Sequence, residues 1–201
     1  MTATPTIRLF RGPEITPWLD QVARLRLAVF RDWPYLYEGG MDYERDYLAA
    51  YARSADSVFV LAFDGDQAVG ASTGLPLADE TPSFQQPFHD ASLPVGSVFY
   101  FGESVLLPRY RGHGLGHAFF DHREAHARAL GRFQITAFCA VDREAEDSRR
   151  PVAHRDNQAF WEKRGYQRRP GMTMQLAWEE TGQGEVMHPL TFWTRALERD
   201  A

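Results

Sequence analysis

The sequence predicts an α/β protein with a mixed, mostly antiparallel sheet of about seven strands and helices on both faces of that sheet. Two observations support this prediction. Most of the expected strands follow one another with a short turn between them, which is typical of antiparallel hairpins. One strand is instead followed by a helix and then a further strand, and such a connection joins parallel neighbours.

The strands are predicted from short runs that are rich in β-branched and aromatic residues and bounded by turn residues. They cover residues 6–10, 57–63, 67–77, 97–107, 132–141, 166–178 and 185–193. Asp64-Gly65-Asp66 separates the second strand from the third, and Thr181-Gly182-Gln183-Gly184 separates the last two. Both separators favour hairpins.

The helices are predicted from apolar residues that recur at spacings of three and four. They cover residues 16–32, 42–53, 115–130 and 156–164. Trp33-Pro34 ends the first helix, because the residue before a proline avoids the helical region. Residues 78–94 contain three prolines and little periodicity, so we expect a long loop there.

Composition limits the classes of function. The length predicts a single domain over residues 1–201, and the net charge of −5 lacks the clustered basic excess that nucleic-acid binding requires. No apolar run approaches the ~20 residues needed to cross a membrane, and the N-terminus does not resemble a secretion signal. Cys139 is the only cysteine, so no intrachain disulfide is expected, and a reducing, cytoplasmic location is predicted.

A glycine-rich segment lies between the strand 97–107 and the helix 115–130. Gly112, Gly114 and Gly116 allow the backbone to approach a ligand closely. The unpaired N–H groups of a helix's first turn favour an anion, and Arg111 adds a guanidinium group that suits phosphate oxygens. These features predict a diphosphate site, although a turn that merely begins a helix remains an alternative.

Other motif-based sites are excluded by the residues present. A Walker A loop needs Gly-Lys-Ser/Thr, which Gly116-His117-Ala118 does not supply. A dinucleotide fingerprint needs a third glycine where His117 or Phe119 stands, and several strand–helix–strand units where one is found. His122 and His126 lack the His-Glu-x-x-His pattern, so no metal site is predicted.

The segment 104–119 resembles motif A of the GNAT superfamily of N-acetyltransferases. The family pattern Gln/Arg-x-x-Gly-x-Gly/Ala is filled by Arg111, Gly114 and Gly116. Residues 157–166 are similar to a later helix–Gly–aromatic motif of the same family. The resemblance implies the acyl-CoA N-acyltransferase fold, with the sheet splayed between the strands 97–107 and 132–141.

The resemblance also implies a coenzyme site, with acetyl-CoA as co-substrate and no metal. Pantetheine would lie along the backbone of Val105, Leu106 and Leu107. The pyrophosphate would be held by the loop and the start of the helix, namely Arg111, Gly112, His113, Gly114, Leu115, Gly116 and His117. Asn157, Phe160 and Lys163 would line the rest of the coenzyme.

Catalysis by direct amine attack on the thioester needs a base, since deprotonating an alkylamine at neutral pH costs roughly 4.6 kcal/mol. Glu103 is the candidate general base; the alternative is a structural carboxylate at a bulge. A backbone N–H near Val105 would meet the oxyanion. Trp161 occupies the place of the tyrosine acid found in many relatives, and Tyr166 is a substitute candidate that core packing also explains.

The predicted function is N-acetylation of a primary amine, on a small molecule or a protein. The alternative is a non-catalytic module that binds or senses acyl-CoA. Trp33, Tyr35 and Tyr37 stand where the acceptor site of the family is often capped, but core packing explains them equally. No nucleic acid or membrane partner is expected, and the resemblance leaves a homodimer open.

Overall fold

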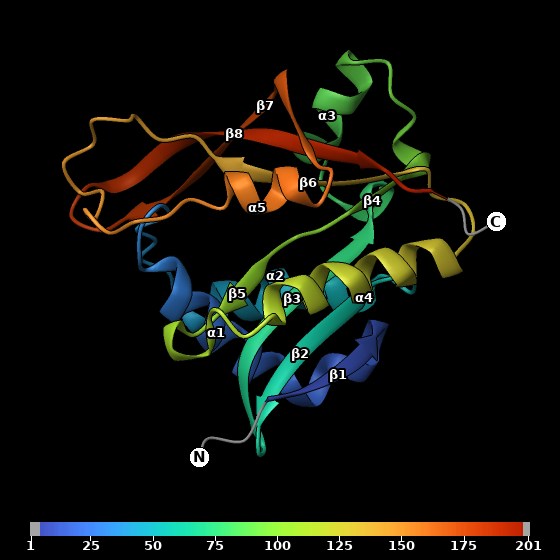
Figure 1. The fold of residues 1–201 in the computed structure, drawn as a ribbon, viewed down its shortest axis with the longest axis horizontal. Coiled ribbons are helices and arrows are strands. Elements are labelled where there is room, and N and C mark those ends of the chain that lie inside the picture. Colours follow the sequence, from blue (N-terminus) through green and yellow to red (C-terminus); the bar gives the residue numbers. More distant parts are fainter. Residues whose placement is uncertain (1–4, 199–201) are drawn as a thin grey trace.

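The centre of the protein is a sheet, seen in Figure 1. In the computed structural model, which describes residues 5–198, this sheet has eight strands. They are β1 (Thr6–Arg11), β2 (Val58–Asp64), β3 (Gln67–Pro76), β4 (Val98–Tyr100), β5 (Ser104–Leu106), β6 (Ile135–Val141), β7 (Gln167–Glu180) and β8 (Gly184–Ala196). Their order along the sheet is β1-β2-β3-β4-β6-β8-β7, and β5 pairs with β3 beside that path. Residues 1–4, part of the N-terminus in which no secretion signal was predicted, lie outside the described chain.

The pairing directions confirm a mixed, mostly antiparallel sheet. Between the strands described, β4 and β6 form the one parallel pair, and α4 lies in the connection between them. The other pairs are antiparallel, including the two predicted hairpins β2–β3 and β7–β8. The single crossover in the sequence therefore accounts for the single parallel pair.

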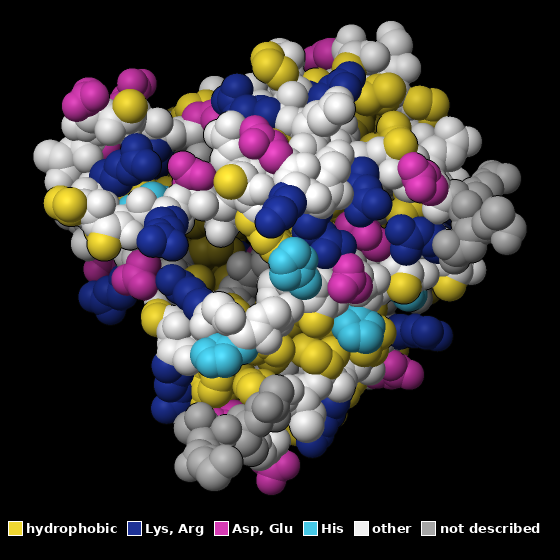
Figure 2. Space-filling view, in the orientation of Figure 1, with side chains coloured by type: hydrophobic (Ala, Val, Ile, Leu, Met, Phe, Trp, Pro, Cys, Tyr) yellow, Lys and Arg dark blue, Asp and Glu magenta, His cyan; other side chains and the backbone are white. Residues whose placement is uncertain are grey.

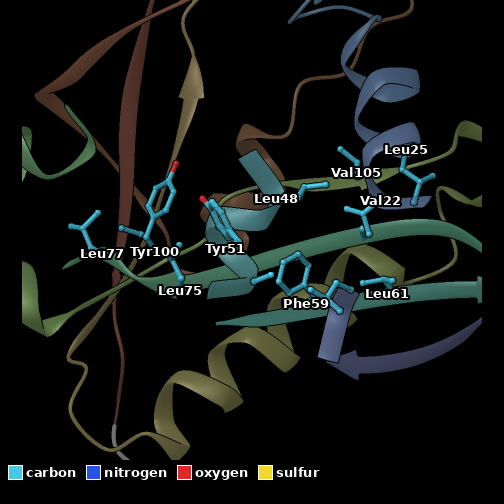
Figure 3. Close-up of a cluster of buried hydrophobic side chains, with 14 of the residues drawn as sticks. Val22, Leu25, Leu48, Tyr51, Phe59, Leu61, Leu75, Leu77, Tyr100 and Val105 are labelled. Atoms are coloured by element: carbon cyan, nitrogen blue, oxygen red, sulfur yellow. The ribbon is translucent and has the colours of Figure 1, made fainter. Parts of the chain in front are cut away.

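Helices cover both faces of the sheet, as predicted. The described residues contain α1 (Leu19–Phe30), α2 (Met41–Arg53), α3 (Pro82–Asp90), α4 (Leu115–Ala129) and α5 (Gln158–Lys163). β2 is buried on both sides: Phe59 and Leu61 pack in one cluster with Val22 and Leu48 of α1 and α2, as Figure 3 shows. The alternate residues of β2 pack in a second cluster that includes α4. None of the helices within residues 5–198 combines the length and apolar character needed to span a bilayer.

The predicted loop 78–94 is wrong, because α3 occupies most of it. Pro82 stands in the first turn of α3, where a proline has no N–H to leave unpaired. Pro87 lies inside the helix, but neighbouring aromatic side chains anchor the segment. Phe84 packs on Tyr100 with ring centroids 5.3 Å apart, and Phe88 packs on Phe192 at 5.0 Å. Tertiary packing therefore overrides the local effect of the prolines.

The predicted strand 97–107 is divided into β4 and β5, which raises the number of strands from seven to eight. The break is a bulge, in which Gly102 donates its N–H to Thr73 O while Thr73 donates its N–H to Glu103 O. Phe101 N–H makes the last bond toward β6, to Ala137 O at 2.7 Å, and β5 then pairs with β3 alone. The sheet opens between β5 and β6, which confirms the splay that the resemblance implied.

The bulge depends on a glycine. A methyl group at Gly102 would lie 2.6 Å from the Tyr51 hydroxyl oxygen and 2.6 Å from Thr73 Oγ1. We expect Gly102→Ala to lower the free energy of unfolding by about 1–3 kcal/mol, as overpacking of a core does. Gly96→Ala is the control, since a methyl group there meets no atom within 4 Å. Urea denaturation measures both, and equal stabilities for the two variants would contradict the steric explanation.

Candidate functional site

The opening between β5 and β6 forms a hollow on the face seen in Figure 2, where hydrophobic side chains lie at its floor. Strand β5 borders this opening. Leu107 donates its N–H to Val69 O at 3.0 Å, and Glu103 O accepts from Thr73 N–H at 3.1 Å, so both residues bond to β3. Because backbone direction alternates along a strand, Val105 also faces β3, whereas Ser104 and Leu106 direct their polar groups away from β3 toward the opening. The Leu106 carbonyl accepts a hydrogen bond from Arg111 Nε at 3.1 Å. Of the residues that the sequence assigned to pantetheine, Leu106 has this orientation; Ser104, which the sequence did not assign, shares it.

The glycine loop has the geometry of an anion site. Gly112 and Gly114 adopt φ values of +80° and +81°, which favour glycine, and Gly114 stands directly before α4. No side chain caps this helix start, and its first turn contains no acidic residue. The N–H groups of Leu115, Gly116 and His117 lie in the first turn of α4, so they have no carbonyl partner inside the helix. An anion at this point would meet both these donors and the positive end of the helix dipole.

The start of α5 lies beside the loop. The Phe160 ring packs edge-on against the His117 imidazole with centroids 4.9 Å apart. A methyl group at Gly116 would meet Phe160 at 3.7 Å, so the two helices approach closely at this point. Asn157, which directly precedes α5, and Lys163, its last residue, are exposed. The structure therefore brings Phe160 to the loop, and with it the helix that carries the other two predicted residues.

Glu103 is buried at the bulge with its side chain on the face covered by α1 and α2. Only 5% of the residue is exposed. One carboxylate oxygen, Oε2, accepts a hydrogen bond from Arg26 at 2.5 Å. The other oxygen, Oε1, is buried and has no hydrogen-bond partner among residues 5–198. Glu103 thus has one oxygen that is held and one that is without a partner.

Arg26 links two buried carboxylates. Its guanidinium donates to Glu44 as well as to Glu103, and its own side chain is 10% exposed. It lies against two aromatic rings, 4.2 Å from the Tyr47 centroid and 5.0 Å from that of Phe30. Burial acts to lower the pKa of Arg26, but Glu103, Tyr47 and Glu44 outweigh it and raise the pKa above its usual range. Arg26 therefore remains charged.

A second buried arginine holds the bulge from the opposite face. Arg123 of α4 is 1% exposed and donates to Thr73 O at 3.2 Å, to Glu103 O at 3.1 Å and to Ser104 Oγ at 2.9 Å. Burial lowers the pKa of Arg123 to about 10, so it stays a cation at neutral pH. Arg26 and Arg123 were both missed in the sequence. Both could have been recognised from the sequence as arginines on the apolar face of a helix. Arg26 follows Val22 by four residues, and Arg123 follows Phe119 by four.

Glu103 is one of the residues that line a pocket of about 110 Å³. Aromatic side chains from α1, α2, the loop after α1, and β7 form much of its wall, namely Phe30, Tyr35, Tyr37, Tyr43, Tyr47 and Trp178. Of the three aromatic residues that the sequence placed near the acceptor, Tyr35 and Tyr37 line this pocket. Trp33 instead packs against His154, with centroids 6.3 Å apart.

Tyr166 lies in the cluster under α4 and does not line this pocket. Its hydroxyl donates to Glu124 at 3.1 Å and lies 2.9 Å from Thr136 Oγ1. Burial, with the charge of Glu124 beside it, raises the pKa of Tyr166 above its usual range. These contacts favour the packing role over the acid role. Trp161 packs against Phe138 and Trp193 at 4.9 and 5.2 Å between centroids.

Cys139 lines the pocket but is held as a thiol. Its sulfur lies 3.2 Å from the Tyr100 hydroxyl, and burial raises the pKa of the thiol to about 12. A thiolate nucleophile is therefore disfavoured. Over the described part of the chain, no group of three or more His, Cys, Asp or Glu side chains is placed to hold a metal ion.

A splayed mixed sheet with a glycine-rich loop at a helix start is the fold of acyl-CoA-dependent acyltransferases. The chain belongs to the GNAT family of acetyltransferases, because the "Acetyltransferase (GNAT) family" model matches residues 23–166.

Solved structures share the fold. An acetyltransferase-like protein of Acinetobacter baylyi is 14% identical over 99% of this chain and 96% of its own, with a TM-score of 0.63. An aminoglycoside 6'-N-acetyltransferase complexed with coenzyme A is 16% identical over 98% and 99%, with a TM-score of 0.60. A phosphinothricin acetyltransferase of Sinorhizobium meliloti in complex with acetyl-CoA is 14% identical over 97% and 89%, with a TM-score of 0.57. A comparison with curated protein sequences finds no match.

Removing the Arg26 charge should destabilise the protein in a pH-dependent way. Arg26→Met leaves Glu44 and Glu103 buried without their cation, and breaking such a pair costs about 3–5 kcal/mol. Two buried negative charges without a counter-charge are costly, and protonation removes that cost, so the variant is favoured at low pH and loses stability as pH rises. We expect the deficit relative to wild type to be larger at pH 8 than at pH 5, as measured by urea denaturation.

The control for this experiment is Arg45→Met. Arg45 forms an ion pair with Asp20 at 2.8 Å, but both side chains are nearly half exposed. Exposed pairs contribute about 0–1 kcal/mol. A deficit for Arg26→Met that stays constant from pH 5 to 8, or that equals the Arg45→Met deficit, would contradict the interpretation of a buried charge cluster.

Proposed function

We propose that the protein transfers an acetyl group from acetyl-CoA to a primary amine, with Glu103 as general base. The observation that carries this proposal is the unpartnered Oε1 of Glu103, buried at the bulge beside the opening of the sheet. A carboxylate oxygen without a partner in a pocket is costly unless a ligand completes it. The ammonium group of an acceptor amine would supply that partner.

Acetyl-CoA would enter along the opening between β5 and β6. Its pyrophosphate would be held by the segment from Arg111 to His117, where the loop and helix start combine donors with a positive dipole. Phe160, Asn157 and Lys163 of α5 would flank the coenzyme. The pantetheine would bond to the backbone of Ser104 and to the N–H of Leu106, since the Leu106 carbonyl already accepts from Arg111 Nε. The N–H groups of the same two residues are better placed than that of Val105 to meet the oxyanion.

The chemistry is direct transfer. The acceptor reaches the site as an ammonium ion, and Glu103 Oε1 takes one proton from it, directly or through water. The amine nitrogen then bonds to the acetyl carbon as the carbon–sulfur bond breaks. Coenzyme A can leave as a thiolate, since a thiol pKa of ~8.5 makes it an acceptable leaving group without an acid. A tryptophan at position 161, in place of the tyrosine acid of many relatives, therefore does not exclude turnover.

Thiol release from acetyl-CoA across a panel of primary amines tests this proposal. Release that requires both an amine and the protein supports acetyl transfer. Coenzyme binding without release for any amine would instead support the non-catalytic acyl-CoA-binding module.

The coenzyme part of the proposal predicts that Gly114→Asp abolishes binding. The substitution adds a carboxylate at the loop, where it would repel the pyrophosphate. Gly182→Asp is the matched control, because Gly182 has a similar φ of +75° and open space around it but lies in the β7–β8 turn. Calorimetry with acetyl-CoA should show at least a 100-fold loss for Gly114→Asp and little change for Gly182→Asp. Equal affinities in the two variants would remove the pyrophosphate from this loop.

The catalytic part predicts that Glu103→Gln lowers kcat by about 10²–10⁴-fold, the usual contribution of a positioned base. The affinity for acetyl-CoA should change little, and raising the pH should restore part of the rate, because solution then supplies free amine. Glu44→Gln is the control, since it breaks the other side of the same Arg26 cluster. We expect it to lower stability with a smaller fall in kcat. If both variants lose turnover equally, and with the same pH profile as wild type, Glu103 is structural.

A further inference from the structure

A chain of four oxygen atoms leads from Glu103 to a second buried carboxylate, that of Glu80. The Tyr47 hydroxyl lies 3.4 Å from Glu103 Oε2 and 3.1 Å from the Tyr51 hydroxyl. Tyr51 in turn donates a hydrogen bond to Glu80 Oε1. Both tyrosines belong to α2 and are four residues apart, so they lie on the same face of the helix. One face of α2 therefore connects the two carboxylates.

This chain has a place for one more proton than its hydroxyl groups supply. The four oxygens make three contacts, and each tyrosine provides one hydrogen. Burial raises the pKa of Tyr47 and of Tyr51 well above the usual value, so both keep their hydrogens at neutral pH. With Tyr47 donating to Tyr51 and Tyr51 to Glu80, the contact between Glu103 and Tyr47 contains no hydrogen. This contact is the longest of the three, as expected for two oxygens without a proton between them.

The two ends of the chain have different surroundings. Arg26 donates to Glu103 Oε2 at 2.5 Å, and its positive charge favours the ionised form of that carboxylate. No arginine or lysine within residues 5–198 forms an ion pair with Glu80. Burial raises the pKa of Glu80, although the hydrogen bond from Tyr51 acts to lower it. The negative charge of Glu103 acts in the same direction as burial. A proton in this chain is therefore held better at Glu80 than at Glu103.

Glu80 also keeps a path to water when the site is filled. It stands between Asp79 and Thr81, which are both exposed, and 9% of Glu80 itself is exposed. The exposed neighbour of Glu103 is Ser104, which borders the opening that the coenzyme would occupy. Two other ionisable groups interact with Glu80 and stay neutral at neutral pH, because burial raises their pKa values, namely Tyr100 and Cys139.

We propose that this chain is the exit for the proton taken from the acceptor, and that the proton ends at Glu80. The inference rests on the proposed role of Glu103 as base. Glu103 Oε1 gains an O–H bond as an N–H bond of the ammonium breaks, and a half-turn of the carboxyl group brings this O–H to the side of Tyr47. Each oxygen then passes one proton to the next, so that Glu103 is again a carboxylate, Glu80 is a carboxylic acid and both tyrosines are unchanged. Water then takes the proton from Glu80, and the two hydroxyl groups turn back.

Turnover of Tyr51→Phe tests this exit, because the substitution removes one oxygen of the chain and keeps the ring. We expect kcat, for an amine identified by thiol release, to fall about tenfold or more, while KM for acetyl-CoA is unchanged. Glu80→Gln, which keeps the shape of the side chain, should have the same effect. The control is Tyr110→Phe, which removes another hydrogen bond from a buried tyrosine to a carboxylate, that of Asp64 at 2.6 Å. Tyr51→Phe with the kcat of Tyr110→Phe would overturn the inference.

A double variant separates proton transfer from a structural role of the tyrosine. In Glu103→Gln no proton reaches the chain, so adding Tyr51→Phe should lower kcat no further. Two independent structural effects would instead multiply. Multiplied losses in the double variant would therefore overturn the inference.

Infrared spectroscopy on the protein without coenzyme distinguishes failure of this inference from failure of acetyl transfer. The carbonyl band of protonated carboxyl groups, followed against pH, should include a group whose pKa lies above the usual value for glutamate, and Glu80→Gln should remove it. Glu103→Gln should lower its midpoint, because the charge at the other end of the chain is lost. A midpoint that Glu103→Gln leaves unchanged would overturn the inference even if thiol is released. A coupled titration without thiol release from any amine would support the proton chain and overturn acetyl transfer.

Discussion

The bulge at Gly102 and Glu103 is the constraint on which the rest of the site depends. It ends the pairing of β4 with β6 and sends β5 along β3 alone, so the sheet opens beside it. The same bulge turns the Glu103 side chain toward α1 and α2. Arg123 holds its carbonyl groups from one face, while Arg26 holds its carboxylate from the other. Two cations on opposite faces thus fix one irregular turn of backbone.

The buried charges contribute little to net stability. Each ion removed from water costs several kcal/mol, and a pair recovers that cost only with good geometry and further hydrogen bonds. Glu103 leaves one oxygen without a partner, so its cost is not fully recovered. The two hydrophobic clusters on either side of β2 must therefore supply the stability. Glu44 also has a buried oxygen without a partner, so the ligand proposed for Glu103 rests on its place at the pocket as well as on its burial.

The periodicity of the sequence predicted most elements, because those elements obey local rules. β2 and β3 are runs of strand-forming residues joined by a short turn. α1 and α4 each bury one apolar face. The errors lie where long-range contacts override local ones. α3 forms despite Pro87 because Phe88 finds Phe192, and the predicted strand 97–107 breaks because Thr73 faces two residues. Within the site, the glycine loop was visible because it is contiguous. The Arg26–Glu103 pair joins residues 77 positions apart, which no local pattern reveals.

The short stretch from Glu103 to His117 places two opposite electrostatic preferences at the two ends of one opening. At the helix start, unpaired N–H groups and the dipole of α4 favour negative charge, and the loop is exposed to water. At the bulge, the buried cluster sets the two carboxylates of Glu44 and Glu103 against the single cation of Arg26, and Glu103 leaves one oxygen without a partner. In the proposed reaction, a coenzyme with an anionic diphosphate and a neutral thioester would fit these preferences in one orientation, with its acyl end toward Glu103. The acceptor amine would then reach the thioester from the side of Glu103. Under that proposal, the order of residues along the chain would specify the direction in which the two substrates meet.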